Sequence, residues 1–178
     1  GAVSFATLLS ENTERAMRQI YETRCRLDRF AALCAPDSFF GCGLQYITRE
    51  SASERLPIYD AEGRFYFSAD CLLDNRKELA LALSASDTEP DGSLMYLAYR
   101  KWGIDCVRRF RGLFSMAVYE TSSKRLYLAA DQTASRCLYY YRSGAAVLFS
   151  TLLDPIAAVC PDIACNDLYL KDFLTAPG

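Results

Sequence analysis

The chain has 178 residues, of which 51% are hydrophobic and 24% are charged, and its formal net charge is −2 at pH 7. This length predicts one domain or at most two small ones, and the near-neutral charge gives no electrostatic case for nucleic acid or an anionic membrane as a partner. The sequence contains no His, which excludes Ser-His-Asp and Cys-His catalysis and His-ligated zinc. Any chemistry must therefore use a carboxylate, Lys, Tyr, Cys or a backbone amine.

Eight Cys residues are spread along the chain without a CxxC pair. Without paired short spacings or His, the sequence predicts no metal site. Several Cys lie inside apolar runs, where Cys behaves as a small hydrophobic residue. We therefore expect reduced, mostly buried thiols in a cytoplasmic protein. No stretch approaches the roughly 20 apolar residues that a membrane span requires, and no membrane partner is expected.

The first half of the chain is expected to hold, in order, a strand, a helix and two further strands, over residues 2–9, about 12–33, 39–48 and 64–69. Asn12 or Thr13 is a suitable N-cap for the helix, and Pro36 follows its end. The last strand is entered through a polar turn at residues 60–63.

The second half is expected to hold helices over residues 74–83, 93–102 and 105–110, strands over 113–119, 125–130, 138–141 and 146–149, and helices over 154–159 and 166–174. Asp91 is a candidate N-cap for the second of these helices. Polar turns separate the four strands and suggest a meander. Helices and strands fall in separate blocks, which is typical of an α+β fold with a largely antiparallel sheet.

Several segments resemble asparagine synthetases. Residues 111–119, RGLFSMAVY, resemble the "DGMFAFALWD" strand of that family, and residues 130–140 resemble its "ARDRFGIKPLYY". Asp91-Gly92-Ser93-Leu94 stands at the start of a helix where the family has "SDxEVIL", and residues 35–37 match its "GPD". The tail resembles "FASELKAL" and "IDxxALxEYL". The agreement is collinear from about Ala35 to Leu174.

The resemblance implies a class II glutamine amidotransferase domain with the N-terminal-nucleophile fold, a four-layer αββα sandwich of two mainly antiparallel sheets between helical layers. Residues 1–178 would form a single domain of this kind, taken from a longer protein with a C-terminal ATP-dependent synthetase domain. By the resemblance, ATP and Mg belong to that synthetase domain and no cofactor is expected in this one. The sequence contains no phosphate-binding loop such as GxxxxGK[ST] or SGGxDS.

In this family the nucleophile is the first residue of the mature chain, and its own α-amine acts as the base. Aligning Val3-Ser4-Phe5-Ala6 with the family's opening "SIFG" puts Ala2 where the nucleophilic Cys would stand. The oxyanion hole is implied at Asp70 and Cys71, where the family has the Asn and Gly of "NGEIYN". A carboxylate at Asp70 would repel a developing oxyanion, although Cys71 could still donate its backbone N–H.

The family also uses an Arg that binds the glutamine carboxylate and an Asp that holds the glutamine amine. Residues 44–48 contain no Arg, and Arg49 and Arg55 are out of register. Asp91 matches the Asp, with a plain helix N-cap as its structural alternative. Three of the four requirements fail, so the resemblance implies a degenerate glutaminase.

We therefore expect a non-hydrolysing domain that acts as a scaffold for a synthetase domain, as in the relatives that close β-lactam or lasso-peptide rings. Its expected partners are the synthetase domain of the same chain and an amino acid or peptide substrate, with a homodimer left open. One alternative is an active glutaminase whose Cys at Ala2 was removed by engineering. The other is a stand-alone binding or assembly module that uses only the surface of the fold.

Overall fold

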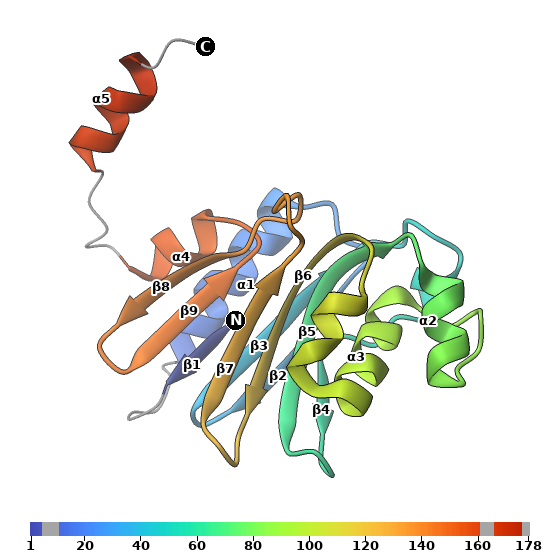
Figure 1. Cartoon of the computed structure of the whole chain (residues 1–178). Helices are drawn as coiled ribbons and strands as arrows, with labels where there is room; N and C mark the ends of the chain where they lie inside the picture. Colours follow the sequence, from blue (N-terminus) through green and yellow to red (C-terminus); the bar gives the residue numbers. More distant parts are fainter. Residues whose placement is uncertain (5–10, 161–165, 176–178) are drawn as a thin grey trace.

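Two antiparallel sheets lie face to face, and helices cover the outer side of each sheet, as the computed structural model shows (Figure 1). The structure describes residues 1–4, 11–160 and 166–175. The expected α+β class and the four-layer sandwich are confirmed. The last helix, α5 (Asp167–Thr175), stands apart from the body of the sandwich.

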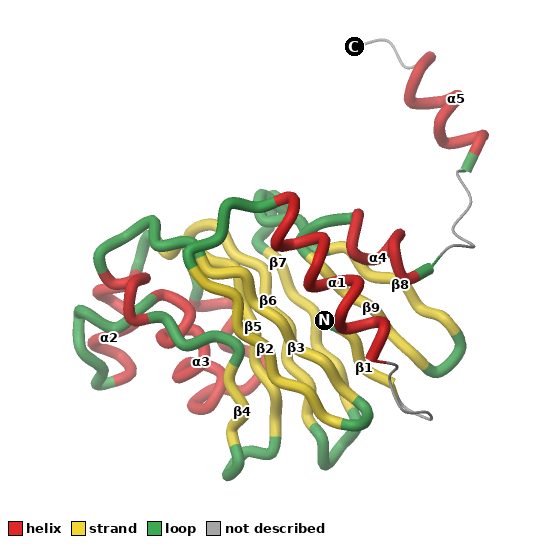
Figure 2. Tube along the Cα trace, turned by 180° about the vertical axis from the view of Figure 1, so that it is seen from behind, coloured by secondary structure: helices red, strands yellow, loops and turns green. Residues whose placement is uncertain are grey.

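The first sheet has five strands in the order β2-β3-β1-β9-β8. Their bounds are Ala2–Ser4 for β1, Arg29–Ala35 for β2, Ser38–Leu44 for β3, Tyr139–Ser143 for β8 and Ala146–Ser150 for β9. Two helices, α1 (Glu11–Arg24) and α4 (Asp154–Val159), lie side by side over its outer face (Figure 2). The short β1 therefore sits in the middle of this sheet, between two strands that are far apart in the sequence.

The second sheet has four strands in the order β4-β5-β6-β7, which are Ile58–Asp60, Phe65–Leu73, Gly112–Glu120 and Arg125–Ala130. The helices α2 (Arg76–Leu83) and α3 (Asp91–Trp102) lie on its side of the sandwich. Two 3-10 helices, η1 (Glu50–Ser53) and η2 (Gly103–Arg109), complete the described elements.

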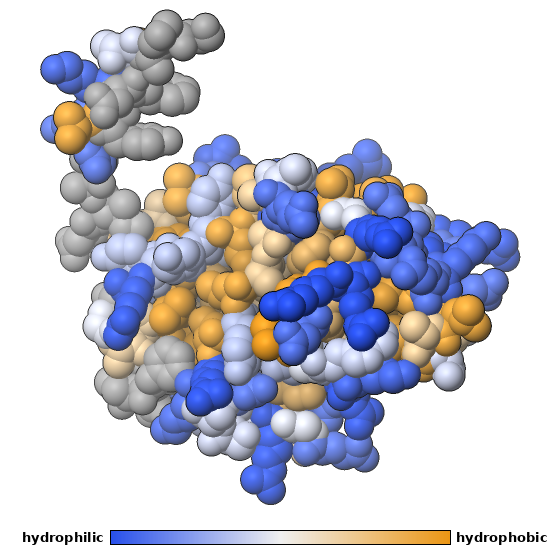
Figure 3. Space-filling model, viewed as in Figure 1, coloured by the Kyte–Doolittle hydropathy of each residue, from blue (hydrophilic) through white to orange (hydrophobic). Residues whose placement is uncertain are grey.

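The apolar core is divided by the sheets. Val3, Phe40, Ala117, Tyr119 and Phe149 form a buried cluster between them. A larger cluster fills the space between the second sheet and α3, and a small one lies under α4. Figure 3 shows apolar surface over β7, β8 and β9, where Leu126, Leu128 and Val147 line an open groove.

The expected helix over residues 12–33 is wrong in its second half. Helix α1 ends at Arg24, and residues Arg29–Ala35 form β2. The apolar residues of this segment fit either period, but β2 pairs with β3 along its whole length, from Arg29 opposite Leu44 to Ala35 opposite Ser38. Pairing across the tight turn at residues 36–37 therefore overrides the local helical pattern.

The expected meander of four strands is also wrong. Strands β6 and β7 pair in the second sheet, whereas β8 and β9 pair in the first. The segment between β7 and β8 thus crosses from one sheet to the other and passes the end of the sandwich. The expected strand over residues 2–9 is confirmed for β1, and residues 5–9 lie outside the described residues. The helix expected over residues 105–110 is the 3-10 helix η2.

The thiols of the described residues form no disulfide and are less buried than expected. All seven cysteines in the described part of the chain lack a disulfide, and only Cys42 and Cys106 are buried. Within the same residues, none of the helices combines the length and the apolar character needed to cross a bilayer.

Candidate active site

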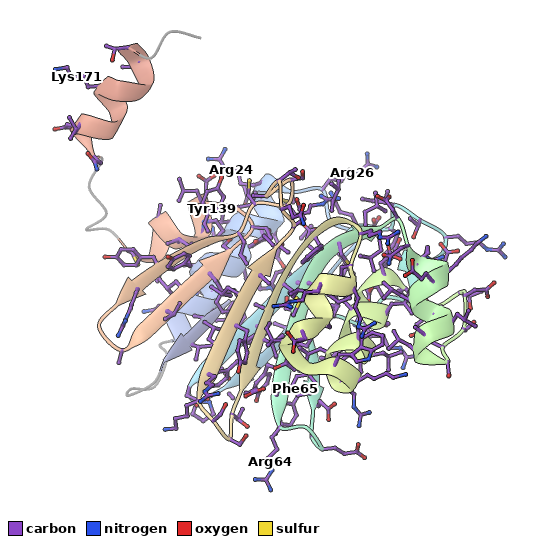
Figure 4. All side chains as sticks on the ribbon, in the orientation of Figure 1. Arg24, Arg26, Arg64, Phe65, Tyr139 and Lys171 are labelled. Carbon is purple, nitrogen blue, oxygen red and sulfur yellow. The ribbon has the colours of Figure 1, made fainter. Side chains whose placement is uncertain are left out.

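A cavity of about 370 Å³ opens at one end of the sandwich. A smaller cavity of about 80 Å³ adjoins it between the sheets, and both are bordered by Tyr21, Gly43, Ala69, Asp70 and Thr151. Figure 4 shows Arg24 and Arg26, which flank the lining residue Cys25, at the end of the molecule opposite Arg64. Tyr21 fixes α1 at this end, since its hydroxyl lies 3.0 Å from Ser150 Oγ and 2.9 Å from Thr151 Oγ1.

Ala2, expected at the nucleophile position, does not line either cavity. Its side chain is fully buried and packs with Leu148 and Ile156 under α4. Side chains alternate between the two faces of a strand, so residue 1 lies on the opposite face, with Val3. Gly1 accordingly lines the smaller cavity. The structure therefore brings residue 1, rather than Ala2, to the smaller cavity.

Residue 1 has no room for a side chain. A Cβ atom added to Gly1 would lie 2.6 Å from Cε2 of Phe149 and 2.9 Å from the carbonyl oxygen of Phe39. Phe149 is itself buried and packs edge-on against Phe40 in the core. A Cys or Ser at this position would therefore require Phe149 and the β3 backbone to move.

Asp70 lies near the end of β5, on the border between the two cavities. Its nearest charged partner is Arg136, with Nε 3.6 Å from Asp70 Oδ1. Burial raises the pKa of the Asp70 carboxyl, and the positive charge of Arg136 opposes this shift. A carboxylate therefore stands where the resemblance requires a neutral donor, which is unfavourable for an oxyanion.

The backbone N–H of Cys71 is directed away from β6. Cys71 pairs with Phe114 and Leu73 with Gly112 in the β5–β6 ladder. Leu73 donates its N–H to Asp91 Oδ2 at 2.9 Å instead of to β6. Since N–H directions alternate along an antiparallel strand, the N–H of Cys71 points to the same side as that of Leu73. One of the two donors that the resemblance implies is thus outside the ladder.

Asp91 is the first residue of α3 and does not cap it, because the N-cap residue is Pro90. Its side chain is only 12% exposed and makes two short contacts. Oδ1 accepts a hydrogen bond from Arg76 Nε at 2.9 Å, and Oδ2 accepts the one from Leu73. Each carboxylate oxygen therefore already accepts one hydrogen bond from the protein itself.

Arg76 is held in place by several acceptors. Its guanidinium donates to the carbonyl oxygens of Asp87 at 3.2 Å and Glu89 at 2.6 Å, and it lies 3.4 Å from Glu50 Oε1. Its side chain is 23% exposed. The contact of Arg76 with Asp91 is consequently a fixed, well-packed charge pair.

Glu54 provides the cap that Pro90 cannot. Its carboxylate accepts hydrogen bonds from the N–H of Gly92 at 2.9 Å and from Ser93 Oγ at 3.4 Å. Burial raises the pKa of this carboxyl, and the backbone hydrogen bonds from Arg55 and Gly92 lower it in part. A buried carboxylate on the cavity wall thus satisfies the N-terminus of α3 from another segment.

The β7–β8 segment is organised by Asp131. Its carboxylate accepts N–H groups of Phe114, Thr133, Ser135 and Arg136 over 3.0–3.3 Å and the hydroxyl of Thr133 at 2.7 Å. These hydrogen bonds hold the pKa of Asp131 well below its usual range. Asp131 therefore forms the turn that follows it and fixes the backbone that carries Arg136.

The thiols of Cys42 and Cys71 are not activated. Burial raises the pKa of Cys71 well above its ordinary value, and that of Cys42 to about 11. Both side chains are therefore neutral at neutral pH, whereas the thiolate is the nucleophilic form. Cys42 is further engaged with Ser68, its Sγ lying 2.9 Å from Oγ across the gap between the sheets.

Of the sequence-predicted site residues, Asp70, Cys71 and Asp91 line one cavity, and Ala2 does not. Arg49 and Arg55 are exposed and are not lining residues. Glu54, Arg76 and Arg136 could not be predicted as site residues, because no sequence spacing links them to their carboxylate or backbone partners. In the described ranges, no group of three or more His, Cys, Asp or Glu side chains could hold a metal ion.

A family model described as a glutamine amidotransferase domain matches residues 44–158, which include Asp70, Cys71 and Asp91. Two asparagine synthetases named as glutamine-hydrolyzing are similar to the chain. Asparagine synthetase 3 of Bacillus subtilis is 30% identical over 90 residues, which cover 51% of this chain and 14% of that protein. The second, provisionally named asparagine synthetase 2 of Methanocaldococcus jannaschii, is 28% identical over 74 residues, 42% of this chain and 14% of that protein. The matched region thus covers a small part of each relative. This chain belongs to the family of glutamine amidotransferase domains found in asparagine synthetase-like proteins.

Proposed function

We propose that this domain no longer hydrolyses glutamine and acts as a scaffold for an ATP-dependent, amide-forming synthetase domain in the same protein. The observation that carries the proposal is the occupied carboxylate of Asp91, the position that would hold the amine of glutamine. Arg76 Nε and the N–H of Leu73 each lie 2.9 Å from one of its oxygens. A glutamine ammonium would have to share these oxygens with a guanidinium that is fixed by further acceptors and that would repel it.

Gly1, which lines the smaller cavity, supports the same proposal. Hydrolysis of an amide by this class of enzyme begins with attack of a side-chain nucleophile on the carbonyl carbon. Gly1 carries no side chain, and Phe149 and Phe39 leave no space for one. The neighbouring thiols of Cys42 and Cys71 have raised pKa values and are poor substitutes.

Asp70 opposes the second step of the chemistry. The tetrahedral intermediate develops negative charge on the former carbonyl oxygen, and loss of one neutral donor already costs about 2.7–4 kcal/mol in other hydrolases. A carboxylate in that place adds repulsion, although the N–H of Cys71 remains outside the β6 ladder. The domain therefore retains the fold of a glutaminase but has a carboxylate, Asp70, where a neutral hydrogen-bond donor is needed.

The scaffold role rests on the family and on the relatives. Both relatives carry the words asparagine synthetase in their names, and the matched part is 14% of each. A domain that catalyses no reaction can still be needed for the neighbouring catalytic region to fold and to stay in position. ATP, Mg and an amino acid or peptide acceptor would then belong to that region.

Glutamate release from glutamine by the full-length protein tests the proposal. We expect no release above the buffer rate and no mass increase on treatment with a diazo-ketone analogue of glutamine, which alkylates active-site nucleophiles. Glutamate release that is lost in Asp91→Asn or Asp70→Ala would overturn the proposal in favour of an active glutaminase. A full-length protein without an ATP-dependent synthetase region would instead favour a stand-alone binding module.

A further inference from the structure

Three arginines, Arg108, Arg109 and Arg111, form an exposed basic surface where η2 ends and β6 begins. Phe110 lies between them in an extended conformation, is only 8% exposed and packs edge-on against Phe114. Side chains alternate along an extended segment, so the burial of Phe110 directs Arg109 and Arg111 to the solvent. Packing of the core, and not pairing with carboxylates, therefore sets the positions of these arginines.

The protein compensates little of the positive charge on this surface. Arg108 lies 3.8 Å from Asp105, but both side chains are highly exposed, and such a pair contributes little to stability. Arg109, Arg111 and the neighbouring Lys101 form no ion pair with any other described residue. The chain as a whole has a net charge of −2, so this concentration of cations is local.

The backbone that carries the arginines is held by the start of α2. The amide nitrogen of the buried Asn75 donates to the carbonyl oxygen of Arg109 at 2.9 Å, and its Oδ1 accepts the N–H of Arg111 at 3.0 Å. The N–H of Asp74 donates to the carbonyl oxygen of Arg111 at 2.9 Å. Two arginine side chains thus project from a fixed backbone, which reduces the conformational entropy lost when they bind a partner.

Trp102, the single Trp of the chain, packs beside the same surface. Arg109 Cζ lies 4.4 Å and Lys101 Nζ 5.4 Å from the centre of its ring, within the range of cation–π contacts. Lys101 also donates to the carbonyl oxygen of Ala82 at 2.7 Å. A guanidinium held over a ring keeps N–H groups at its edge, where it can bind a carboxylate through two parallel hydrogen bonds.

The arginines of the neighbouring helices are used differently. Arg76 and Arg100 each place Nε beside a carboxylate oxygen, at 2.9 and 3.0 Å. Arg109 and Arg111 have no such carboxylate among the described residues, and next to them Ile104 is 36% exposed. Exposed Arg and Trp beside an apolar side chain are typical of the residues that dominate binding at protein interfaces.

We propose that this surface binds an acidic, partly apolar segment of another protein chain. We name it the η2 patch and define it by six residues: Lys101, Trp102, Ile104, Arg108, Arg109 and Arg111. Carboxylates of the segment would contact the arginines, and an apolar side chain would pack beside Trp102 and Ile104. A long polyanion such as a nucleic acid suits the patch less, because it would extend beyond four cations over a protein of net charge −2.

The η2 patch shares no residue with the linings of the two cavities. Binding there depends neither on hydrolysis of glutamine nor on its loss. The inference therefore goes beyond the proposed function, since it gives the domain a surface for a separate protein in addition to its contact with a synthetase domain.

Titration of a fluorescent peptide, Glu-Glu-Phe-Glu-Glu-Leu, with the full-length protein tests the inference, with anisotropy as the readout. The same peptide with Gln in place of each Glu is the matched probe, because it keeps the length and the apolar residues without the charges. We expect saturable binding of the acidic peptide, weakened by salt, and binding of the Gln peptide about tenfold or more weaker. Arg109→Gln combined with Arg111→Gln should weaken binding of the acidic peptide by a similar factor.

Arg108→Gln combined with Arg111→Gln is a second variant, which leaves Arg109 on Trp102 and should also weaken binding. Arg26→Gln is the control, since Arg26 is exposed, forms no ion pair with a described residue and lies at the cavity end of the molecule (Figure 4); the affinity should stay unchanged.

Four results would each overturn the inference. The first is no binding of the acidic peptide up to about 1 mM, which includes a patch already covered in the full-length protein. The second is equal affinity for the Gln peptide, and the third is wild-type affinity in both double variants. The fourth is an oligothymidylate of about 12 nucleotides that competes with the peptide and binds more tightly, which would identify a nucleic-acid site instead.

Discussion

Glu54 and Gly92 are in direct contact at the N-terminus of α3, with Glu54 Oε2 2.9 Å from the Gly92 nitrogen. The absence of a side chain at Gly92 makes this possible. A Cβ there would lie 2.6 Å from Glu54 Oε2 and 2.5 Å from Leu56 Cδ1. Gly92 thus allows the buried Glu54 carboxylate to approach the helix N-terminus closely. At a helix position without such a contact, Ala would be more stable than Gly.

We expect Gly92→Ala to lower the free energy of unfolding by about 1–3 kcal/mol, although Ala is the better helix former. Urea denaturation followed by circular dichroism measures the change. Combining the substitution with Glu54→Ala should cost less than the two single changes added together, because the shorter side chain removes part of the clash. A neutral or stabilising Gly92→Ala would contradict the contact described.

The buried carboxyl of Glu54 should make stability depend on pH in a defined direction. Its pKa is raised by burial and by the neighbouring charge of Asp91, while the N–H groups of Arg55 and Gly92 and the hydroxyl of Ser93 oppose the shift. The folded state therefore keeps a proton that the unfolded state releases at the ordinary pKa of Glu. Its contribution to stability is fully present below that ordinary value and is lost as pH rises through the raised one.

Glu54→Gln isolates this effect, since Gln cannot titrate and retains an acceptor oxygen. The stability of wild type relative to Glu54→Gln should fall between about pH 4 and pH 7. Urea denaturation of both proteins across this range is the measurement. A difference that stays constant with pH would show that the carboxyl titrates at its ordinary pKa.

The three-residue strand β4 of the second sheet was not predicted. Strands β5, β6 and β7 and the helices α2 and α3 could be predicted from the sequence, because their apolar periods are clear and their turns are polar. The β2 segment could not. Residues 25–33 fit a helical period, and only the pairing of β2 with β3 across residues 36–37 decides the outcome. Non-local pairing of this kind is not encoded in a local window.

The site divides in the same way. Asp70, Cys71 and Asp91 could be placed in one cavity through the resemblance, since motif order fixes their positions on β5 and α3. Their partners could not be found. Arg76 and Asp91 are 15 residues apart in the sequence, and Arg136 contacts Asp70 from the segment between β7 and β8. Each pair therefore exists only in the folded chain. The motif alignment placed Ala2 at the nucleophile position, whereas in the structure Gly1 and not Ala2 lines the smaller cavity.

The Arg76–Asp91 pair should matter for stability far more than exposed pairs do. Removing one member of a partly buried pair leaves the other charge without compensation. We expect Arg76→Gln to lower the free energy of unfolding by about 2–4 kcal/mol, measured by urea denaturation. Arg108→Gln, which breaks the exposed pair with Asp105, is the matched control and should have no measurable effect. Equal effects of the two substitutions would contradict the closed state of Asp91.

The segment between β7 and β8 should loosen when its organising carboxylate is removed. Asp131 accepts hydrogen bonds from four backbone N–H groups, one from Phe114 and three from the turn that follows Asp131. Together with the Thr133 hydroxyl, these bonds lower the pKa of Asp131. In Asp131→Ala these groups lose their acceptor, so we expect faster amide hydrogen exchange over residues 132–137. Exchange measured by mass spectrometry on peptides of the segment is the readout, with a peptide of α3 as internal reference.

Asp131→Asn separates geometry from charge, because its amide oxygen can still accept some of the N–H groups. It should show an intermediate rate of exchange over the same residues. Since the pKa of Asp131 is lowered on folding, wild type should approach Asp131→Asn only as acid protonates the folded carboxyl, well below neutral pH. Unchanged exchange in Asp131→Ala would show that the segment is held by other contacts, and the fixed position of Arg136 opposite Asp70 would then need another cause.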